Sequence, residues 1–348
     1  MLSSLFGYGW RGEPPKVGPN GPRRLLIVRA DRLGDLVIST SCIQPLLEAW
    51  PETEVAFAVA EPFADIIRRR ERLKVWAIGN QPAAVWEERI RAFEPSAVVF
   101  LNPHPKLESI AETARIPIRI GTSRERGARL TYWRPYNWKK QGTQHEAAYN
   151  FGLLSALGLQ APGRWLPDDF SHCTYTGDLP DAFQLIHLSS FGNKPTVSPA
   201  YWADLAEALR ARYGWLPVIV GSDKHDPAIG QFLQHLPKEL HKIVPVLAGK
   251  TTPAELAGLC RRACCMLSRD SGPAHLAAAT GCPTLTIFLS QRPLMSPQRW
   301  HPLGTYSSVY IEPITPLPFE SAHNEARRIN KRLCIDSAVQ IVGDMINS

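Results

Sequence analysis

The sequence predicts an α/β protein made of two doubly wound halves, each built on its own parallel sheet. Three observations lead to this fold class. The chain has 348 residues, which is too long for one ordinary α/β core and suits two domains of roughly 150 residues each. Short apolar runs typical of buried parallel strands alternate with helical segments from residue 24 onward. This alternation stops at a stretch rich in Pro, Gly and Asp and then begins again.

The domain boundaries follow from this pattern. Residues 11–22 are rich in Pro and Gly, and we expect residues 1–22 to form a flexible N-terminal extension. Residues 23–165 form the first Rossmann-like domain, 166–182 the linker, 183–335 the second Rossmann-like domain and 336–348 a terminal helix. Ligands of such sheets bind beyond the carboxyl ends of the strands, so we expect both domains to face a central cleft.

The first half begins with the apolar run at 24–29, which predicts a buried strand. The turn ADRLGD then leads into a helix that ends near Trp50, because Pro51 follows. Further strands are expected at 54–60, 73–79 and 97–102, and further helices at 62–72, 84–93 and 145–157, the last of which Gly158 ends. Residues 119–145 combine basic and aromatic residues without periodicity, so we expect an exposed basic loop.

The second half repeats the pattern. Its helix at 199–213 has a suitable cap in Ser198 and a proline at its first position, and Thr252 precedes the helix at 253–262. Strands are expected at 184–189, 215–220, 264–268 and 283–289, and further helices at 274–280 and 336–346.

Charge and cysteine content restrict the partners and the compartment. The net charge of +7 fits either a solvated basic surface or attraction to an anionic partner. The sequence lacks helix-turn-helix, zinc-finger and RNA-binding signatures, so we expect no specific nucleic-acid binding. The seven cysteines lack paired spacing and are expected to be buried thiols in a reducing cytoplasm. No apolar run is long enough to span a membrane, and the first ten residues do not resemble a signal peptide.

The strongest local motif lies where the strand at 264–268 ends and a small-residue turn opens an Ala-rich helix. Free backbone amides and the helix dipole at such a start can bind an anion, for example a pyrophosphate. Asp270 at the strand end could hold sugar hydroxyls, although Asp270 or Ser271 could instead only cap the helix. The expected donor-binding residues here are Asp270, Ser271, Gly272, Pro273, Ala274 and His275.

The second motif is the turn after the first strand. It contains neither GxGxxG nor GxxxxGK[ST], which argues against a standard NAD site and a Walker A loop. Asp35 stands after the flexible Gly34 at a helix start, where its carboxylate could take a proton from an acceptor hydroxyl. Asp31 is an alternative base, helix capping is the structural alternative for Asp35, and Arg29 and Arg32 could hold anionic groups.

Two further motifs also follow strands. Ser189, Ser190 and Lys194 suit a phosphate contact, in which the lysine would offset charge on a departing diphosphate. His187, inside the strand, is expected to be a core histidine. Acidic side chains after the strand at 215–220 could bind ribose hydroxyls. The expected donor-binding residues of this loop are Gly221, Ser222, Asp223 and Asp226.

The segments RLLIVRADRLGDLVIST and SRDSGPAHLAAATGCPTLTIF together resemble glycosyltransferase family 9, whose best-known members are heptosyltransferases of lipopolysaccharide core synthesis. The resemblance runs from about residue 23 to 345 and includes IRIG at 118–121 and His145-Glu146 before a helix. It implies a GT-B fold whose C-terminal half binds the nucleotide sugar. It also implies inverting transfer of heptose from ADP-heptose without a metal or other cofactor, which agrees with the absence of a DxD motif.

The resemblance also implies roles for individual residues. Asp35 matches the catalytic base, Lys194 the phosphate-binding lysine and Asp270 the residue that contacts the donor sugar. The expected acceptor is an anionic glycolipid at the inner face of the inner membrane, which the basic stretch at 119–140 would meet. The expected acceptor-binding residues are Arg32, Gly34, Arg119, Arg124 and His145.

The sequence departs from the family pattern in its long, proline-containing N-terminal extension and at two further places. Lys194 is followed by Pro195-Thr196-Val197 where the family usually has Trp-Pro, and Ser41 replaces an early proline of the first helix. Pro45, one turn later, should kink that helix. Two other interpretations therefore stay open: a GT-B transferase that uses a UDP- or GDP-sugar, and a non-catalytic nucleotide-sugar-binding protein of the same fold.

Overall fold

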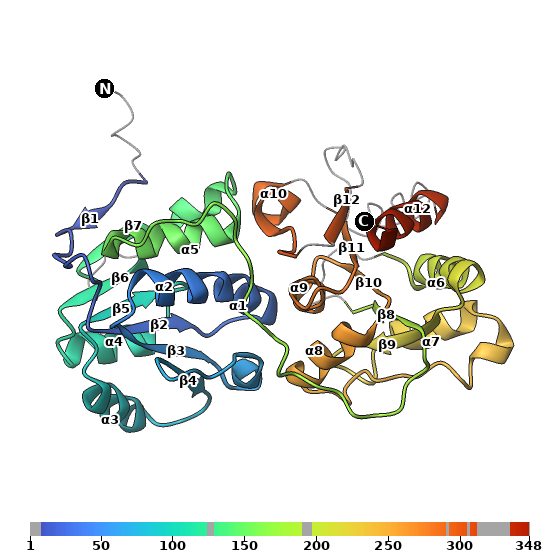
Figure 1. The fold of residues 1–348 in the computed structure, drawn as a ribbon, viewed down its shortest axis with the longest axis horizontal. Helices are drawn as coiled ribbons and strands as arrows, with labels where there is room; N and C mark the ends of the chain where they lie inside the picture. The colour runs from blue at the N-terminus through green and yellow to red at the C-terminus, as the bar shows by residue number, and fades with distance from the viewer. Residues whose placement is uncertain are drawn as a thin grey trace. The chain divides into compact units, whose positions relative to one another are not determined.

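The computed structural model describes residues 8–123, 129–189, 197–289, 292–304, 307–311 and 335–347 (Figure 1). The chain divides into two compact units, Met1–Asp168 and Asp169–Ser348. The boundary follows Asp168, within the stretch 166–182 that was expected to link two domains. No described helix is long and apolar enough to cross a membrane.

Unit 1 is built on a seven-stranded sheet, counted over its described residues, with the order β1-β7-β6-β5-β2-β3-β4. All neighbouring strands run parallel except β1, which pairs antiparallel with β7. The strands are β1 Arg11–Gly12, β2 Arg24–Arg29, β3 Glu54–Ala60, β4 Leu73–Ile78, β5 Ala97–Phe100, β6 Ile118–Ser123 and β7 Tyr132–Pro135.

Helices cover both faces of this sheet. On one face, α3 (Ala83–Phe93) and α4 (Pro105–Thr113) pack on Leu26 and Val28 of β2. Since side chains alternate along a strand, Arg29 points to the opposite face. There α1 (Leu33–Ser39) packs against α5 (Glu146–Leu154) (Figure 1).

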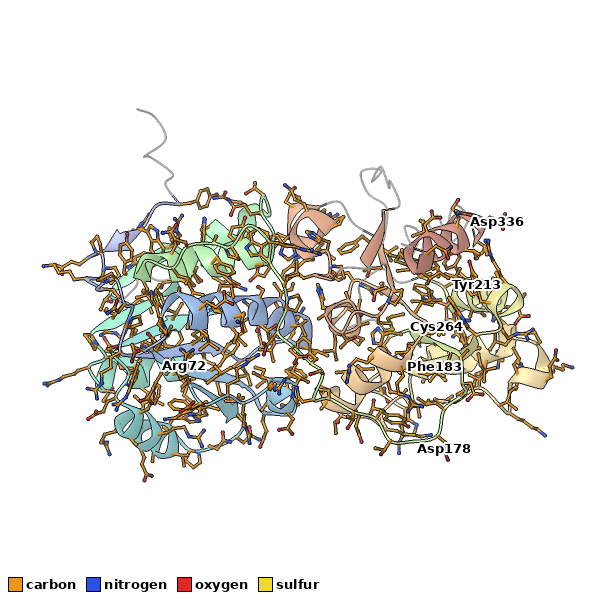
Figure 2. The ribbon with its side chains drawn as sticks, in the orientation of Figure 1. Arg72, Asp178, Phe183, Tyr213, Cys264 and Asp336 are labelled. Carbon is orange, nitrogen blue, oxygen red and sulfur yellow. The ribbon has the colours of Figure 1, made fainter. Side chains whose placement is uncertain are left out.

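The predicted first helix is interrupted. It consists of α1, a 3₁₀ turn η1 (Thr40–Cys42) and α2 (Ile43–Ala49). The hydroxyls of Thr40 and Ser41 donate to the carbonyls of Val37 and Ile38, and Pro45 has no amide to donate to Ser41. The helix ends as expected at Trp50, where Arg72 donates to the carbonyls of Leu47 and Trp50 (Figure 2).

Three expectations for unit 1 differ from the structure. The helix expected at 62–72 is a short 3₁₀ helix, η2 (Glu61–Ile66), followed by extended chain at Ile67. Beyond it, Arg70 binds both carboxylate oxygens of Asp168, which fixes that segment to the end of the unit. The 119–145 stretch is not one exposed loop, because it contributes β6, β7 and the 3₁₀ helix η3 (Tyr136–Gln141).

The third difference concerns the N-terminal extension. Residues 8–22 are described, and β1 extends the sheet along β7. The Trp10 ring stacks on Tyr132 with centroids 4.4 Å apart, and the Arg134 guanidinium lies 4.7 Å from the Trp10 ring. Aromatic stacking and cation–π contacts therefore hold this segment on the sheet edge. Of the other aromatic residues of the basic stretch, Trp133 is part of the unit 1 core and Trp138 packs edge-on against Tyr149.

Unit 2 contains a parallel sheet of five described strands in the order β12-β11-β10-β8-β9. They are β8 Phe183–His187, β9 Leu216–Val220, β10 Cys265–Arg269, β11 Thr284–Phe288 and β12 Ser307–Ile311. The helices are α6 Pro199–Tyr213, α7 Pro227–His235, α8 Pro253–Arg262, α9 Gly272–Ala279, α10 Pro297–Trp300 and α12 Ile335–Asn347. One face packs on α6, α7 and α12, and Phe183 is buried within the sheet (Figure 2).

Local capping signals place the unit 2 helices where the sequence predicts them. Ser198 accepts a hydrogen bond from the Tyr201 amide at the start of α6, and Gly214 ends this helix with φ of +78°. Thr252 and Glu255 form a capping box at the start of α8. The structure adds α7, α10 and β12, for which the sequence analysis predicted no elements.

Candidate active site

Asp35 lies in the first turn of α1, directly after the carboxyl end of β2. Its side chain is 15% exposed, so the carboxylate is fixed by protein and still reaches the surface of unit 1. The N-cap residue Arg32 makes no capping bond with its side chain. Asp35 is the acidic residue of the first turn of α1, where a negative charge interacts favourably with the helix dipole.

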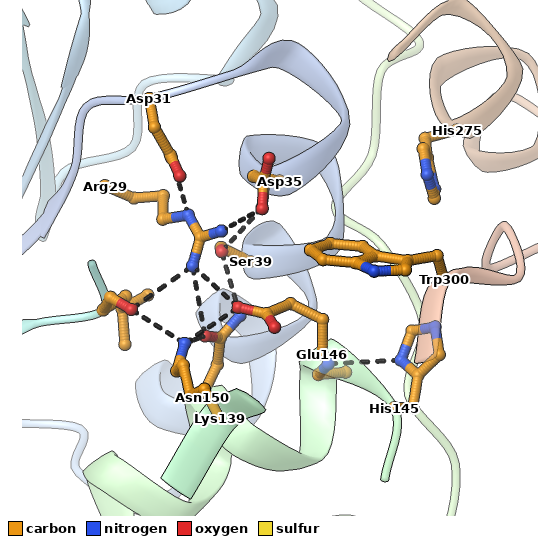
Figure 3. A network of polar contacts seen from close by, with 12 residues as sticks. Arg29, Asp31, Asp35, Ser39, Lys139, His145, Glu146, Asn150, His275 and Trp300 are labelled. Carbon is orange, nitrogen blue, oxygen red and sulfur yellow. Dashed lines mark hydrogen bonds and ion pairs between the residues drawn. The ribbon is translucent and has the colours of Figure 1, made fainter. Parts of the chain in front are cut away.

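Arg29 holds the Asp35 carboxylate. One terminal nitrogen of its guanidinium donates to Asp35 Oδ1, and Nε lies 2.8 Å from Asp31 Oδ1 (Figure 3). The other terminal nitrogen donates to Glu146 Oε1 at 3.1 Å. The expectation that Arg29 could hold an external anion is therefore wrong, because its 2% exposed side chain already binds three carboxylates of the protein.

A second cation lies behind Arg29. Lys139 Nζ donates to Glu146 Oε1 at 2.8 Å, to Asn150 Oδ1 at 3.0 Å and to the Leu101 carbonyl at 2.8 Å. Lys139 comes from η3, while Glu146 and Asn150 lie one helical turn apart on α5. Asn150 Nδ2 in turn donates to Ser39 Oγ, which donates to the carbonyl of Asp35. This network ties the side chain and the backbone of Asp35 to α5 (Figure 3).

Electrostatics keep the Arg29 guanidinium ionised. Burial alone would lower the pKa of Arg29, but the carboxylates of Asp31, Asp35 and Glu146 outweigh this effect and raise it. Two cations, Arg29 and Lys139, face three carboxylates, so the formal charge of the cluster is −1 when all five groups are ionised. Lys139, Glu146 and Asn150 were not among the residues predicted from the sequence to belong to the site. The signal for the last two was their i, i+4 spacing on a helix that starts at His145.

The other residues expected to bind the acceptor do not all lie near Asp35. Gly34 is buried in α1 beside Asp35, and Arg32 is exposed in the preceding turn. His145 is the N-cap of α5, where its Nδ1 accepts from the Ala147 amide, and its ring stacks on Trp165. Arg119 binds the backbone carbonyls of Ile116 and Arg129 and lies level with Leu26, three residues and about 10 Å before Arg29 along the sheet. The structure therefore does not bring Arg119 to Asp35, and Arg124 lies outside the described residues.

The start of α9 in unit 2 has the backbone geometry of an anion site. Ser271 is its N-cap and accepts from the Ala274 amide at 3.4 Å, while the His275 amide donates to the Ser271 carbonyl. Pro273 has no amide. Within the described ranges, no protein acceptor is present for the amides of Ser271 and Gly272, and both residues are partly exposed. A negatively charged ligand could accept hydrogen bonds from these two amides.

Charged and polar side chains surround this helix start. Asp270 follows the carboxyl end of β10, and its Oδ1 lies 3.6 Å from His275 Nε2. Ser268 Oγ lies 2.8 Å from Ser271 Oγ and 3.4 Å from His187 Nδ1. Burial lowers the pKa of His187 to about 4, so this histidine is neutral at pH 7. It is a hydrogen-bonded core residue, as expected.

The loop after β9 shows two structural hydrogen bonds. Asp226 caps α7 through the Ala228 amide at 2.9 Å, and Asp223 accepts from the His225 amide at 2.8 Å. A Cβ on Gly221 would stand 3.2 Å from Ser189 Oγ, so the ends of β8 and β9 meet closely. Gly221, Ser222 and Ser189 thus lie together at one edge of the sheet. Ser190 and Lys194 lie outside the described residues.

No three His, Cys, Asp or Glu side chains of the described ranges gather in a way that could hold a metal ion. The six cysteines that the structure describes are free thiols. Burial raises the pKa values of Cys42 and Cys260 to about 12, so these two thiols are poor nucleophiles and poor metal ligands.

Comparisons with known proteins give this arrangement a family. The sequence model of glycosyltransferase family 9 (heptosyltransferase) matches residues 109–321. Lipooligosaccharide heptosyltransferase 2 of Haemophilus influenzae is 33% identical over 109 residues, which cover 31% of this chain and 31% of that protein. Lipopolysaccharide heptosyltransferase 3 of Escherichia coli is 24% identical over 289 residues, which cover 73% of this chain and 80% of that protein.

A solved structure shows the same fold. The ADP-heptose lipopolysaccharide heptosyltransferase II of E. coli superposes with a TM-score of 0.74 at 17% identity, covering 93% of this chain and 98% of that one. This likeness confirms the predicted GT-B fold class with its two α/β units. Since the family match extends over more than half of the sequence, this chain belongs to glycosyltransferase family 9.

Proposed function

We propose that this protein transfers a heptose from ADP-heptose to a hydroxyl of a lipopolysaccharide core acceptor, with inversion at the anomeric carbon and without a metal ion. Family membership supports glycosyl transfer. The names of the relatives and of the solved structure support heptose as the sugar, ADP-heptose as the donor and lipopolysaccharide as the acceptor. The proposal places the enzyme in the cytoplasm, at the inner face of the inner membrane where the glycolipid acceptor would lie.

One observation carries the chemical part of the proposal. Asp35 is a partly exposed carboxylate that a buried guanidinium holds at the carboxyl end of β2. A general base must be ionised and within reach of the proton that it takes. The ion pair with Arg29 favours the ionised form of Asp35, and its partial exposure makes the carboxylate accessible from the surface of unit 1. Asp31, the alternative base, pairs with Nε of the same guanidinium and has a side chain that is 24% exposed. Its position makes it the natural comparison in mutagenesis.

The bond changes follow from these roles. The acceptor hydroxyl gives its proton to the Asp35 carboxylate as its oxygen forms the bond to the anomeric carbon. The bond from that carbon to the diphosphate oxygen breaks, and its electron pair leaves with ADP. The amides at the start of α9 and Lys194 would stabilise the charge of the leaving ADP, the task that a divalent cation performs in other transferases. Asp270 would contact the donor sugar.

Acceptor recognition is the remaining part. We keep Arg32, Gly34 and His145 as acceptor-binding candidates; they lie at the starts of α1 and α5 in unit 1. Arg32 is exposed and could meet a phosphate or carboxylate of the glycolipid. Arg119 stays a prediction, and its guanidinium binds the backbone carbonyls of Ile116 and Arg129.

A donor panel tests the proposed function. Purified protein is given ADP-heptose, a UDP-sugar or a GDP-sugar together with heptose-deficient core glycolipid, and mass spectrometry follows the glycolipid. We expect a mass increase of one heptose with ADP-heptose only, at an unchanged rate in EDTA. Transfer from the UDP- or GDP-sugar alone would reject the donor assignment. Donor binding without transfer to any core acceptor would favour the non-catalytic interpretation.

A further inference from the structure

The cluster around Asp35 contains more charged side chains than are needed to hold one carboxylate in place. Arg29 alone would pair with Asp35 and give a neutral unit. Instead Asp31 and Glu146 share the same guanidinium, and Lys139 binds the far side of Glu146. Glu146 is 2% exposed and Lys139 7%, so water screens neither charge effectively.

This charge balance decides how readily Asp35 accepts a proton. A carboxylate paired with a lone guanidinium is a weak base, because protonation leaves a net positive charge on the pair. In this cluster of charge −1, protonation of Asp35 leaves a formal charge of zero. The negative charge of Glu146 therefore favours proton uptake, whereas the positive charge of Lys139 opposes it.

We propose that Glu146 and Lys139 are positioning residues that set the proton affinity of Asp35 through their opposite charges on either side of the Arg29 guanidinium. This inference rests on the proposed role of Asp35 as the base. Among the described residues of unit 1, the charged and titratable groups around Asp35 on α1, η1, η3, α5 and the end of β2 are Arg29, Asp31, Arg32, Cys42, Lys139, His145, Glu146 and Tyr149. Among them, Glu146 and Lys139 form the ion pair that can be neutralised one charge at a time or as a pair.

The geometry permits nearly isosteric variants. In Glu146→Gln, the amide oxygen can still accept from Arg29 and Lys139, so the variant loses a charge and keeps the acceptor that both cations use. In Lys139→Met, the apolar chain has a similar length and lacks the charge. The double variant Glu146→Gln/Lys139→Met removes one charge of each sign and leaves the total charge of the cluster unchanged.

The pH dependence of kcat/KM gives the direction of each effect. Activity falls on the acidic side as the base becomes protonated, and this acidic limb reports the base. Glu146→Gln should move the limb to lower pH by on the order of one pH unit, and Lys139→Met should move it to higher pH. The double variant should return it toward the wild-type position, which a purely structural role would not do.

A second readout does not depend on turnover. In protein labelled with ¹³C at the aspartate carboxyl carbons, the signal that Asp35→Asn removes is assigned to Asp35, and its titration is followed in each variant. We expect the same order, with Lys139→Met titrating highest and Glu146→Gln lowest. Equal Asp35 titration curves in the wild type and in all folded variants would overturn the inference. So would single variants that both shift in the same direction.

The two proposals fail differently. If Asp35→Asn keeps wild-type turnover, Asp35 is not the base and the proposed function loses its central residue. If Asp35→Asn abolishes turnover but the limb does not respond to Glu146 and Lys139, only the role of these two residues is wrong. Circular dichroism of every variant separates either result from misfolding. If each single variant misfolds because one buried charge has lost its partner, the double variant still tests the inference, because it removes both charges.

Discussion

Replacing Arg29 by methionine should destabilise unit 1 far more than any surface arginine does. The Arg29 side chain is 2% exposed and binds Asp31, Asp35 and Glu146, so its removal takes the shared cation from Asp31 and Asp35 and leaves Glu146 with Lys139. Breaking a buried ion pair by removing one partner typically costs roughly 3–5 kcal/mol. We therefore expect Arg29→Met to lose about 3–5 kcal/mol of unfolding free energy at pH 7.

Arg24→Met is the matched control, because Arg24 begins the same strand. Its side chain is 20% exposed and pairs with Glu94 at 2.9 Å and Glu54 at 3.9 Å, whose side chains are 73% and 45% exposed. Solvated pairs of this kind contribute at most about 1 kcal/mol. Urea titration gives both free energies. Hydrogen exchange of β2 and α5 peptides assigns the transition to unit 1.

The loss in Arg29→Met should also depend on pH. Without the guanidinium, repulsion and burial raise the folded-state pKa values of the remaining carboxylates. The folded state then binds more protons than the unfolded state, so stability rises as the pH falls from 7 toward 5. In the wild type, the raised pKa of Arg29 contributes stability that is lost only in strongly alkaline solution. Equal losses for Arg29→Met and Arg24→Met, or an Arg29→Met loss independent of pH, would refute this reasoning.

Two further predictions concern unit 2. A Cβ on Gly258 of α8 would stand 2.3 Å from the carbonyl carbon of Thr174, so Gly258→Ala should lower the unfolding free energy by about 1–3 kcal/mol. A Cβ on Gly230 of α7 would meet no atom of the described residues within 4 Å, so Gly230→Ala should instead raise the unfolding free energy by about 0.5–1 kcal/mol. Equal urea midpoints for the two variants would contradict this comparison. Burial lowers the pKa of His187 from 6.5 to about 4, so the stability it contributes is complete above pH 6.5 and is lost as the pH falls toward 4, by about 3 kcal/mol. Urea titrations between pH 7.5 and 4.5 should show a smaller loss in His187→Gln, and an equal loss would contradict the buried, neutral histidine.

Local signals predicted much of the fold. The apolar run of β2, the Ser198 cap of α6 and the capping box of α8 lie in consecutive residues, so the sequence contains them in full. The helix expected at 62–72 failed because Arg70 binds Asp168, 98 residues away in sequence. β7 was missed for a similar reason, since its ring contacts are with a segment near the N-terminus. Periodicity carries no information about partners so far along the chain.

In the candidate site too, the features coded by neighbouring residues were predicted and those that depend on distant residues were not. Asp35 and the start of α9 follow predicted strands directly, so the strand–turn–helix pattern marked both. Glu146 is 117 residues from Arg29 in sequence, and no local pattern indicated that their side chains meet. The role of Arg29 was misjudged for this reason. An arginine after a strand suits an anionic ligand equally well until its internal carboxylates are known.

The account depends most on Asp35 as the base, and one pair of measurements tests this directly. We would determine single-turnover heptose transfer and the Kd of ADP-heptose for the wild type, Asp35→Ala, Asp35→Asn and Asp31→Asn, with Glu48→Gln, an exposed acid on α2, as the control. The account predicts that both Asp35 variants lose transfer while their donor Kd stays within a few fold of wild type, and that Glu48→Gln keeps both. Wild-type transfer by Asp35→Asn, or loss of transfer in Asp31→Asn alone, would contradict it.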